Sequence, residues 1–210
     1  ENVITTDNKG NVILYSVERQ EIIFTYNFYK KRFKKLDKNL NVISEKNIIY
    51  VADNIGYLYA LNYKTRKLLW AKNYKIPFRS NLKISGEKII LANQDNSLYI
   101  LNKFNGDKIR FIPTEETTIK NDFINSLALS DDSIFYLNTY GSFYSIDNQN
   151  LRINWLTNLN ETIDLNNSNL FYSNTIISNK DIIIISTDPY LYVINANTGV
   201  TILKIPITSI

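Results

Sequence analysis

Short apolar runs alternate with polar turn residues along the whole chain, and no stretch keeps the 3.6-residue period of a helix over a useful length. The clearest unit runs from Asn47 to Trp70. It predicts a strand, a tight turn at Gly56, an alternating strand over Leu58–Asn62, a second turn at Lys64–Arg66 and a short strand that ends on Trp70. The many Ile and Tyr residues in these runs favour strands.

This unit occurs five times along the chain, with spacings of 46, 40, 45 and 48 residues between the aligned first turns. The residues aligned at the first turn are Gly10, Gly56, Asn96, Gly141 and Pro189. The residues fourteen positions later are Phe24, Trp70, Arg110, Trp155 and Leu203, with Phe111 beside Arg110 as a large apolar alternative. Gly or Asn supplies the positive φ that a two-residue hairpin turn needs, so proline in the fifth copy predicts a different turn.

One further apolar segment precedes each copy from the second onward. These segments are Leu40–Ile43, Leu82–Ile84, Ser126–Leu129 and Ser173–Ile177. Four short strands in roughly 45 residues are typical of a β-propeller blade, because a single four-stranded meander cannot bury both faces and stacked blades bury one another. We therefore predict an all-β fold of about five four-stranded antiparallel blades, with repeats at 1–35, 36–77, 78–122, 123–169 and 170–210. A β-sandwich is the alternative.

The composition excludes several classes of chemistry. The 210 residues include no Cys, His or Met. Without Cys there are no disulfides, thiolate nucleophiles or Cys-based zinc sites, and without His there is no Ser–His triad and no imidazole metal ligand. No apolar run approaches the 18 or so residues of a membrane span. Because Met is absent even at position 1, we expect the numbering to start inside a longer or processed polypeptide.

The net charge of +4 arises from one segment, residues 30–38, without which the chain would hold 18 basic and 19 acidic residues. Its basic residues are Lys30, Lys31, Arg32, Lys34, Lys35 and Lys38, interleaved with the aromatic residues Phe28, Tyr29 and Phe33. Such a pattern can bind an acidic partner, anionic lipid headgroups or single-stranded nucleic acid, and a solvated connection between blades is the simplest alternative. We expect no nucleic acid partner, and we expect Phe33 to turn back and anchor the segment.

The acidic residues do not predict a metal site. They gather at Glu115–Glu116, Asp131–Asp132 and Asp164, and none of these has the Asp-x-Asp-x-Asp-Gly spacing of a calcium loop. Adjacent carboxylates on loops are usually solvated. We therefore predict no catalytic residue, no cofactor and no metal ligand.

Residues Ala60–Trp70 resemble the pattern Ala-x-Asp-x-x-Thr-Gly-Lys-x-x-Trp of the PQQ-type, tryptophan-docking β-propeller repeats. Asn62 replaces the Asp and Arg66 replaces the Gly, whereas the fifth copy keeps Thr198–Gly199 and has no Trp. In that family the indole docks between neighbouring blades, so the resemblance implies a structural role. The docking residues that it implies are Phe24, Trp70, Trp155 and Leu203.

The resemblance leaves the number of blades open. Residue 1 falls at the second strand of a blade, so five blades close into a ring if Ile205–Ile210 supplies the missing strand of the first. Family members commonly have seven or eight blades, and we favour the alternative that this chain is part of such a larger ring.

One activity that the resemblance implies is that of a quinone-dependent dehydrogenase. Those enzymes hold a quinone and Ca²⁺ at the centre of an eight-bladed ring, with a vicinal Cys pair and an Asp base. This chain has no Cys and is less than half their usual size. A dehydrogenase-related propeller is therefore kept only as an alternative.

The stretch Trp70–Ile84, followed by Lys88–Tyr99, resembles the blade junction of BamB-type lipoproteins, which carry a Pro-Leu-Arg-Ser-like step and an Asp-Asn-x-Leu-Tyr turn. Asn81 and Leu82 depart from it where Pro often follows. The resemblance implies a non-catalytic periplasmic scaffold, anchored to the outer membrane by an N-terminal lipid outside this chain, that helps a β-barrel insertase. A cytosolic scaffold that binds an acidic partner is the alternative. The predicted partner or lipid contacts are Lys30, Lys31, Arg32, Lys34, Lys35 and Arg79.

Overall fold

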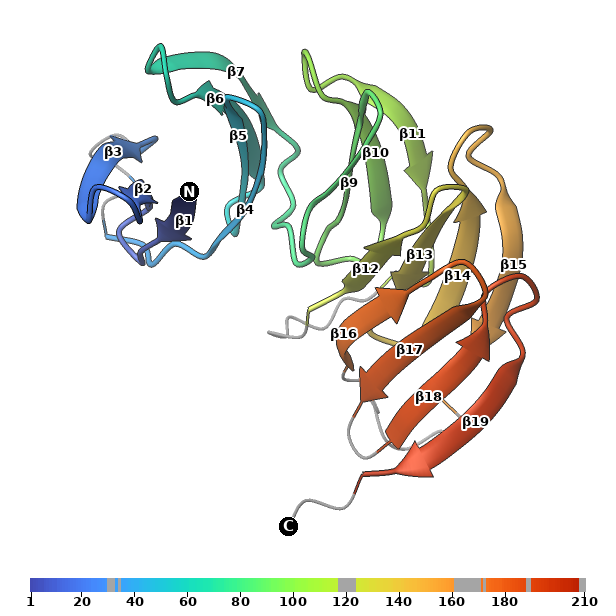
Figure 1. Cartoon of the computed structure of the whole chain (residues 1–210). Coiled ribbons are helices and arrows are strands. Elements are labelled where there is room, and N and C mark those ends of the chain that lie inside the picture. The colour runs from blue at the N-terminus through green and yellow to red at the C-terminus, as the bar shows by residue number, and fades with distance from the viewer. Residues whose placement is uncertain are drawn as a thin grey trace. The chain divides into compact units, whose positions relative to one another are not determined.

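The computed structural model describes residues 1–29, 33, 35–116, 124–160, 171, 173–187 and 190–207. All regular elements that extend over several residues in this part of the chain are β-strands joined by turns (Figure 1). None of its segments is a helix long and apolar enough to cross a membrane.

The described strands form five antiparallel sheets, and within each sheet the strands are neighbours in sequence order (Figure 1). The first sheet comprises β1 (Asn2–Thr6), β2 (Asn11–Ser16) and β3 (Glu21–Asn27). The second comprises β4 (Leu40–Glu45), β5 (Ile48–Asp53), β6 (Tyr57–Asn62) and β7 (Lys67–Asn73). The third comprises β8 (Lys83–Ser85), β9 (Lys88–Ala92), β10 (Leu98–Asn102) and β11 (Lys108–Ile112).

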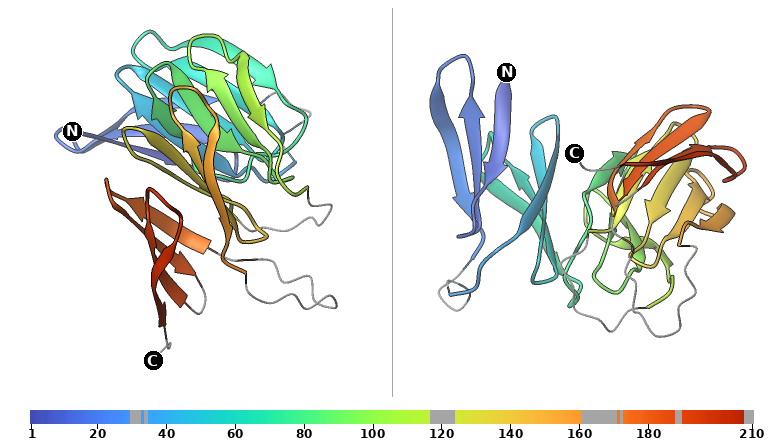
Figure 2. Two further views of the ribbon diagram at one scale, coloured as in Figure 1. Left: turned by 90° about the vertical axis from the view of Figure 1, so that its right-hand side faces the viewer. Right: turned by 90° about the horizontal axis from the view of Figure 1, so that it is seen from below.

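The two remaining sheets repeat this four-stranded meander. The fourth comprises β12 (Ser126–Leu129), β13 (Ser133–Leu137), β14 (Ser142–Asp147) and β15 (Ile153–Asn158). The fifth comprises β16 (Ser173–Ser178), β17 (Ile182–Thr187), β18 (Tyr190–Asn195) and β19 (Thr201–Pro206). The strands twist within each sheet, as the two further views show (Figure 2). The all-β, propeller-type fold predicted from the sequence is confirmed.

Contacts divide the chain into two compact units. The first holds residues 1–78 together with the turn 103–107, and the second holds residues 79–102 and 108–210. In the first unit Val12, Leu40 and Ile49 lie in the core, and in the second unit Phe135, Leu137 and Phe143 do so. Each unit therefore has a hydrophobic core of its own.

Burial differs sharply between strands of one sheet. The inner strand β5 is buried at five of its six positions, whereas the last strand β7 is exposed at six of seven. A strand that is apolar on both faces needs a neighbour on each side, which stacked blades provide and a two-layer sandwich does not. This difference explains why the inner strands read as near-continuous apolar runs in the sequence.

In the first four sheets a side chain holds the first turn of the repeat closed, a feature that the sequence analysis did not single out. In the second sheet the Oδ1 atom of Asp53 accepts backbone N–H bonds from Ile55 (2.9 Å) and Tyr57 (2.8 Å). Asp7, Asn93 and Asn138 make the same pair of bonds in the first, third and fourth sheets. Each acceptor lies three residues before the turn residue. Such Asx bonds hold a turn closed without help from a strand.

The turn residues themselves have the positive φ that the repeat alignment predicted. Gly10, Gly56 and Gly141 have φ between 83° and 98°, and Asn96 has φ 65°. Pro189 lies outside the described residues. In the fifth sheet Ile205 pairs with Leu191 inside the sheet itself, so this part of the C-terminal segment is not a strand of the first sheet.

Candidate functional site

The indole of Trp70 lies on β7, half-buried, against the turn Lys103–Asp107 of its own compact unit. Its Nε1–H donates a hydrogen bond to the Lys103 carbonyl oxygen at 3.1 Å, and its ring centroid is 6.3 Å from that of Tyr50. Gly106 faces the ring so closely that a β-carbon there would lie 2.8 Å from Trp70 Cζ3. Tyr74 Oη also donates to the Gly106 carbonyl oxygen. Trp70 is therefore fixed by one directed bond and by close packing.

Trp155 on β15 has the same arrangement in the second unit. Its Nε1–H donates to the Ala196 carbonyl oxygen at 3.0 Å, and its ring lies 5.3 Å from that of Phe143 and 6.1 Å from that of Phe135. A β-carbon on Gly199 would lie 2.6 Å from Trp155 Cε3. The two tryptophans thus occupy equivalent positions and use equivalent partners.

The other docking positions differ from the tryptophans. Phe24 is 5% exposed and packs with Leu14 and Leu61 in the core of the first unit. Leu203 is 49% exposed, so the part of the chain that the structure describes provides no docking surface for it. Arg110 is exposed as well. The docking position is therefore occupied in different ways in different repeats.

The residue that faces the docking position varies with it. In all five sheets a left-handed residue precedes the last strand, and these residues are Gln20, Arg66, Gly106, Leu151 and Gly199. It is glycine in the two copies that lie against a tryptophan ring, where a β-carbon would collide with the indole. Outside those two copies it carries a side chain. The ring and the glycine therefore form one matched pair.

The basic segment is described only in part. Lys30, Lys31, Arg32 and Lys34 lie outside the described residues, and Lys35 is exposed. Lys38, by contrast, is only 5% exposed: its Nζ donates to the Phe33 carbonyl oxygen and lies 5.2 Å from the centroid of the Tyr29 ring. The expectation that Lys38 belongs to an exposed basic cluster was wrong, because an aromatic ring and a carbonyl group replace its solvent.

The aromatic residues around this segment anchor its ends. Tyr29 Oη donates to Asp53 Oδ2 at 2.7 Å, and burial together with the Asp53 charge raises the pKa of Tyr29 far above its usual value. Phe28 stacks on Tyr59 with 4.2 Å between the ring centroids. The ring centroid of Phe33 lies 6.4 Å from those of both Tyr29 and Tyr57. Phe33 therefore turns back toward the sheet, as expected from the sequence.

Arg79 follows Phe78 at the start of the second unit and lies in a segment whose backbone is held on two sides. Its N–H donates to the Ala92 carbonyl oxygen at 3.0 Å, and its own carbonyl oxygen accepts from the Asn125 N–H at 2.8 Å. Ser80 Oγ accepts the Ala92 N–H, and Arg79 Nη2 lies 3.5 Å from Gln94 Oε1. The guanidinium is thus partly buried on a rigid backbone.

Asn96 and Glu115 form a polar network in the second unit. Asn96 is fully buried; its Nδ2 donates to the Glu115 carbonyl oxygen at 3.1 Å, and its Oδ1 accepts from Thr139 Oγ1 at 2.9 Å. The Glu115 carboxylate accepts from Asn138 (2.7 Å), Ser142 (2.8 Å) and Tyr144 (3.1 Å). Partial burial alone would raise the pKa of Glu115, but these donors hold it below its usual value. This network ties the segment after β11 to the fourth sheet.

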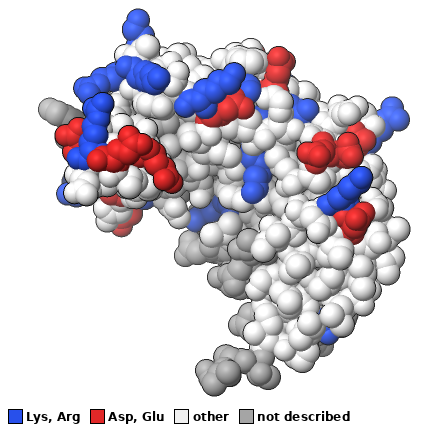
Figure 3. Space-filling view, in the orientation of Figure 1, with Lys and Arg blue, Asp and Glu red and all other residues white. Residues whose placement is uncertain are grey.

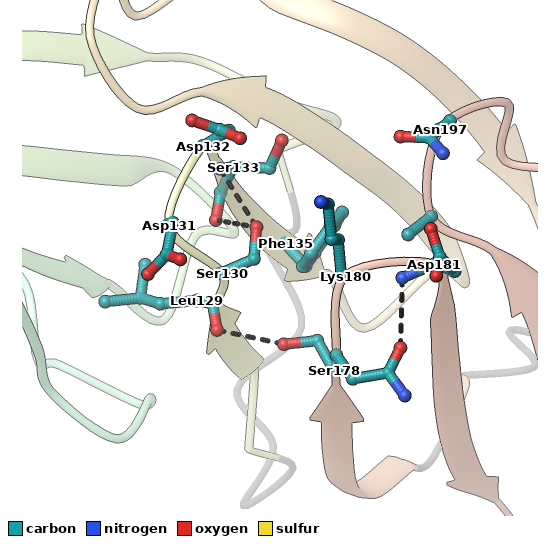
Figure 4. Close-up of a pocket in the computed structure, with 12 residues that line it drawn as sticks. Leu129, Ser130, Asp131, Asp132, Ser133, Phe135, Ser178, Lys180, Asp181 and Asn197 are labelled. Carbon is teal, nitrogen blue, oxygen red and sulfur yellow. Dashed lines mark hydrogen bonds between the residues drawn. The ribbon is translucent and has the colours of Figure 1, made fainter.

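A pocket of about 630 Å³ opens in the second unit, at the turns that follow β12, β16 and β18 (Figure 4). Lys180 projects into it, between the turn that carries Asp131 and the turns that carry Asp181 and Asn197 (Figure 4). Ser178 Oγ donates to the Leu129 carbonyl oxygen at 2.9 Å and ties two of these turns together. The rim thus presents positively and negatively charged side chains that can form hydrogen bonds.

Two positions that line this pocket hold small residues, whereas the corresponding positions of the first unit hold a large ion pair. In the first unit Lys103 Nζ lies 2.6 Å from Glu45 Oε2. Ala196 corresponds to Lys103, since both accept the indole hydrogen bond. Ser130 corresponds to Glu45, since each closes its two-residue turn. The replacement of the ion pair by small residues can be found in the sequence only when the repeat copies are aligned residue by residue.

The charged side chains are unevenly distributed. Both signs occur over the first and second sheets, whereas the visible face of the fifth sheet carries few of them (Figure 3). Among the described residues, no group of three or more Asp and Glu side chains is placed to hold a metal ion. Of the acidic residues noted in the sequence, Asp131 and Asp132 lie at the pocket rim, and Asp164 lies outside the described residues.

Solved structures of low sequence identity share this fold. BamB from Moraxella catarrhalis superimposes with a TM-score of 0.79 at 15% identity, over 99% of this chain and 62% of that one. The computationally designed Ika8 protein gives 0.75 at 11% identity, over 97% and 58%, and Saccharomyces cerevisiae Sqt1 gives 0.71 at 14% identity, over 94% and 56%. The chain thus spans about three fifths of the length of these structures.

Sequence comparison identifies the family directly. No curated protein sequence matches the chain significantly. The family model described as outer membrane protein assembly factor BamB, in contrast, matches residues 1–205, nearly the whole chain. Together with the tryptophan-docking repeats, this match places the chain in the PQQ-type propeller family described as outer membrane protein assembly factor BamB.

Proposed function

We propose that this chain is a non-catalytic protein-interaction scaffold of the bacterial cell envelope, which assists the assembly of outer-membrane β-barrel proteins as BamB does. The observation that carries the proposal is the family match over residues 1–205. Its partner is a protein, the β-barrel insertase. Its place is the periplasm, with an outer-membrane lipid anchor that precedes residue 1 of this chain.

The segment around Arg79 supports a scaffold role. A rigid backbone presents this side chain, because its own N–H donates to the Ala92 carbonyl oxygen and its own carbonyl oxygen accepts from the Asn125 N–H. A pre-positioned arginine loses little entropy on binding and can bind a carboxylate through two parallel bonds. Arg79 is therefore the first residue to test as a contact with the insertase.

The composition favours a non-enzyme. General acid–base catalysis near neutral pH most often uses His, and covalent catalysis often uses Cys, and the chain has neither. The docking aromatic residues and the side-chain bonds at the turns instead stabilise the repeats, which then present a stable surface. A quinone-dependent activity is the alternative, and binding of the quinone with Ca²⁺ at micromolar affinity would favour it over the scaffold role.

Direct binding to the insertase tests the proposal. The purified chain and the purified periplasmic domain of the β-barrel insertase from the same organism would be combined in biolayer interferometry. We expect micromolar binding, and at least about tenfold weaker binding for Arg79→Glu. Arg19→Glu, an exposed charge reversal on the first sheet, is the matched control. Absence of binding by the folded wild-type chain would refute the proposed partner.

The basic segment is a second candidate contact, for anionic lipid rather than protein. Reversal of Lys30, Lys31, Lys34 and Lys35 to Glu would be compared with wild type in sedimentation with phosphatidylglycerol vesicles and in insertase binding. A loss confined to vesicles would assign the segment to the membrane surface. Unchanged, salt-insensitive binding in both assays would show that the segment contacts neither.

A further inference from the structure

The third repeat lacks the matched pair of tryptophan and glycine. Arg110 on β11 pairs with Ile100, as Trp70 pairs with Ala60 and Trp155 with Ser145, so it stands at the docking position. Leu151 stands where Gly106 and Gly199 lie, and it keeps their left-handed backbone with φ 59°. A leucine is tolerated there because no indole occupies the space. This junction is therefore built differently from the two tryptophan junctions.

The space that the indole leaves is a groove of about 380 Å³, which lies wholly in the second unit. Its lining includes Arg110 and Arg152, with Phe111, Leu151 and Ile153 as apolar neighbours. Phe111 is 36% exposed and Ile153 is 49% exposed. Apolar surface of this kind, next to charged groups, is typical of a surface that a partner covers.

The two guanidinium groups lack acidic partners in the part of the chain that the structure describes. The ion pairs found there join other residues, and none includes Arg110 or Arg152. Lys108 adds a third positive charge beside the groove, with its Nζ 5.6 Å from the centre of the Phe111 ring. Two arginines in one groove, with no acidic partner among the described residues, favour a ligand that brings carboxylates.

The groove runs along an edge strand. β11 is the last strand of the third sheet, and its residues 108–111 are exposed. The outer edge of such a strand leaves backbone N–H and C=O groups free for an added strand, in which alternate side chains face the same side. An extended segment thus fits better than a helix.

We propose that this groove binds an extended acidic segment of a partner protein, in which carboxylates alternate with apolar side chains. The carboxylates pair with Arg110 and Arg152, and the apolar side chains cover Phe111 and Ile153. The proposal concerns a surface other than the Arg79 segment and does not depend on a role in outer-membrane assembly.

A labelled peptide of about ten residues, with Glu and Val in alternation, is the probe. Its binding to the whole chain would be measured by fluorescence anisotropy at low and at physiological salt. We expect salt-sensitive binding that weakens at least about tenfold in the double variant Arg110→Glu, Arg152→Glu, because reversed charges repel the carboxylates. The same peptide with Lys in place of Glu is expected not to bind.

Arg19→Glu is the matched control and should leave the affinity within about twofold. The double variant Arg110→Trp, Leu151→Gly rebuilds the tryptophan and glycine pair and fills the groove. It should abolish peptide binding while the thermal midpoint stays equal or rises. If the charge-reversed chain does not fold, Arg110→Gln with Arg152→Gln replaces it in the same assay.

Three results would overturn the proposal. One is that the wild-type chain does not bind the Glu and Val peptide, even if it binds phosphatidylglycerol vesicles or RNA. Another is that Arg19→Glu weakens binding as much as the groove variant does. The third is that the Lys peptide binds equally well.

Discussion

The ring of Trp155 leaves no room for a side chain on Gly199, since a β-carbon there would lie 2.6 Å from Cε3 of the indole. Gly199 also has φ 73°, which an L-residue adopts at a cost of about 1 kcal/mol. Gly199→Ala should therefore lower the free energy of unfolding by about 2–4 kcal/mol, measured by urea denaturation.

Gly86→Ala is the control for this substitution. Gly86 has φ 56°, and nothing lies within 4 Å of the position a β-carbon would take. Gly86→Ala should lower the free energy of unfolding by only about 1 kcal/mol, which is the cost of the left-handed backbone alone. In a Trp155→Leu background the effect of Gly199→Ala should fall toward that value. Equal losses for Gly86→Ala and Gly199→Ala would contradict the packing account.

Lys38 should contribute to stability although it belongs to a basic stretch of sequence. Lys38→Ala removes the bond to the Phe33 carbonyl oxygen and the contact with Tyr29, so we expect a loss of about 1–3 kcal/mol in chemical denaturation. Lys35→Ala, at an exposed position of the same stretch, should change stability by less than about 0.5 kcal/mol. A similar loss in both variants would argue against the buried contact.

The ion pair between Lys103 and Glu45 should be worth more than the one between Lys72 and Asp107. The side chain of Lys103 is 13% exposed, whereas those of Lys72 and Asp107 are 44% and 62% exposed. Double-mutant cycles with alanine should give a coupling energy of about 1 kcal/mol or more for the first pair and less than about 0.5 kcal/mol for the second. The reverse order would show that burial does not decide the strength of these pairs.

Glu115 should make stability depend on pH in the acid range. Hydrogen bonds hold its pKa below the usual value, so its contribution is fully present above the pKa of the unfolded state and is lost as pH falls through the lower pKa of the folded state. Glu115→Gln should therefore flatten the fall of the unfolding free energy between about pH 5 and pH 3, measured by urea denaturation at several pH values. Glu116→Gln is the neighbouring control, and an equally flat profile for it would contradict the assignment.

The repeat predicted the fold well because its signals are local. The apolar runs, the left-handed turn residues and the fourteen-residue step from Gly56 to Trp70 each depend on a few adjacent residues, and the strands and turns followed them. The side-chain bonds that Asp53 and Asn93 make at the turns were missed although their signal is also local: a short acceptor side chain lies three residues before the turn residue.

Contacts between distant residues could not be predicted in this way. Lys38 sits in a run of lysines, and only the folded chain brings the ring of Tyr29 beneath it. The network around Glu115 joins the segment after β11 to residues 23 or more positions away. Arg152 was not noticed because nothing near it in sequence marks it; it matters only beside Arg110 across the groove.

The close fit between Trp155 and Gly199 also restricts the order in which such a junction can change by single substitutions. While the indole is present, a side chain added at the glycine overlaps the ring and destabilises the junction. The aromatic ring has to be lost first, and only then is the left-handed position open to a residue such as leucine. A junction of the Arg110 and Leu151 kind is thus reached through an intermediate that has lost the ring and still has the glycine, and loss of packing is greatest at that step.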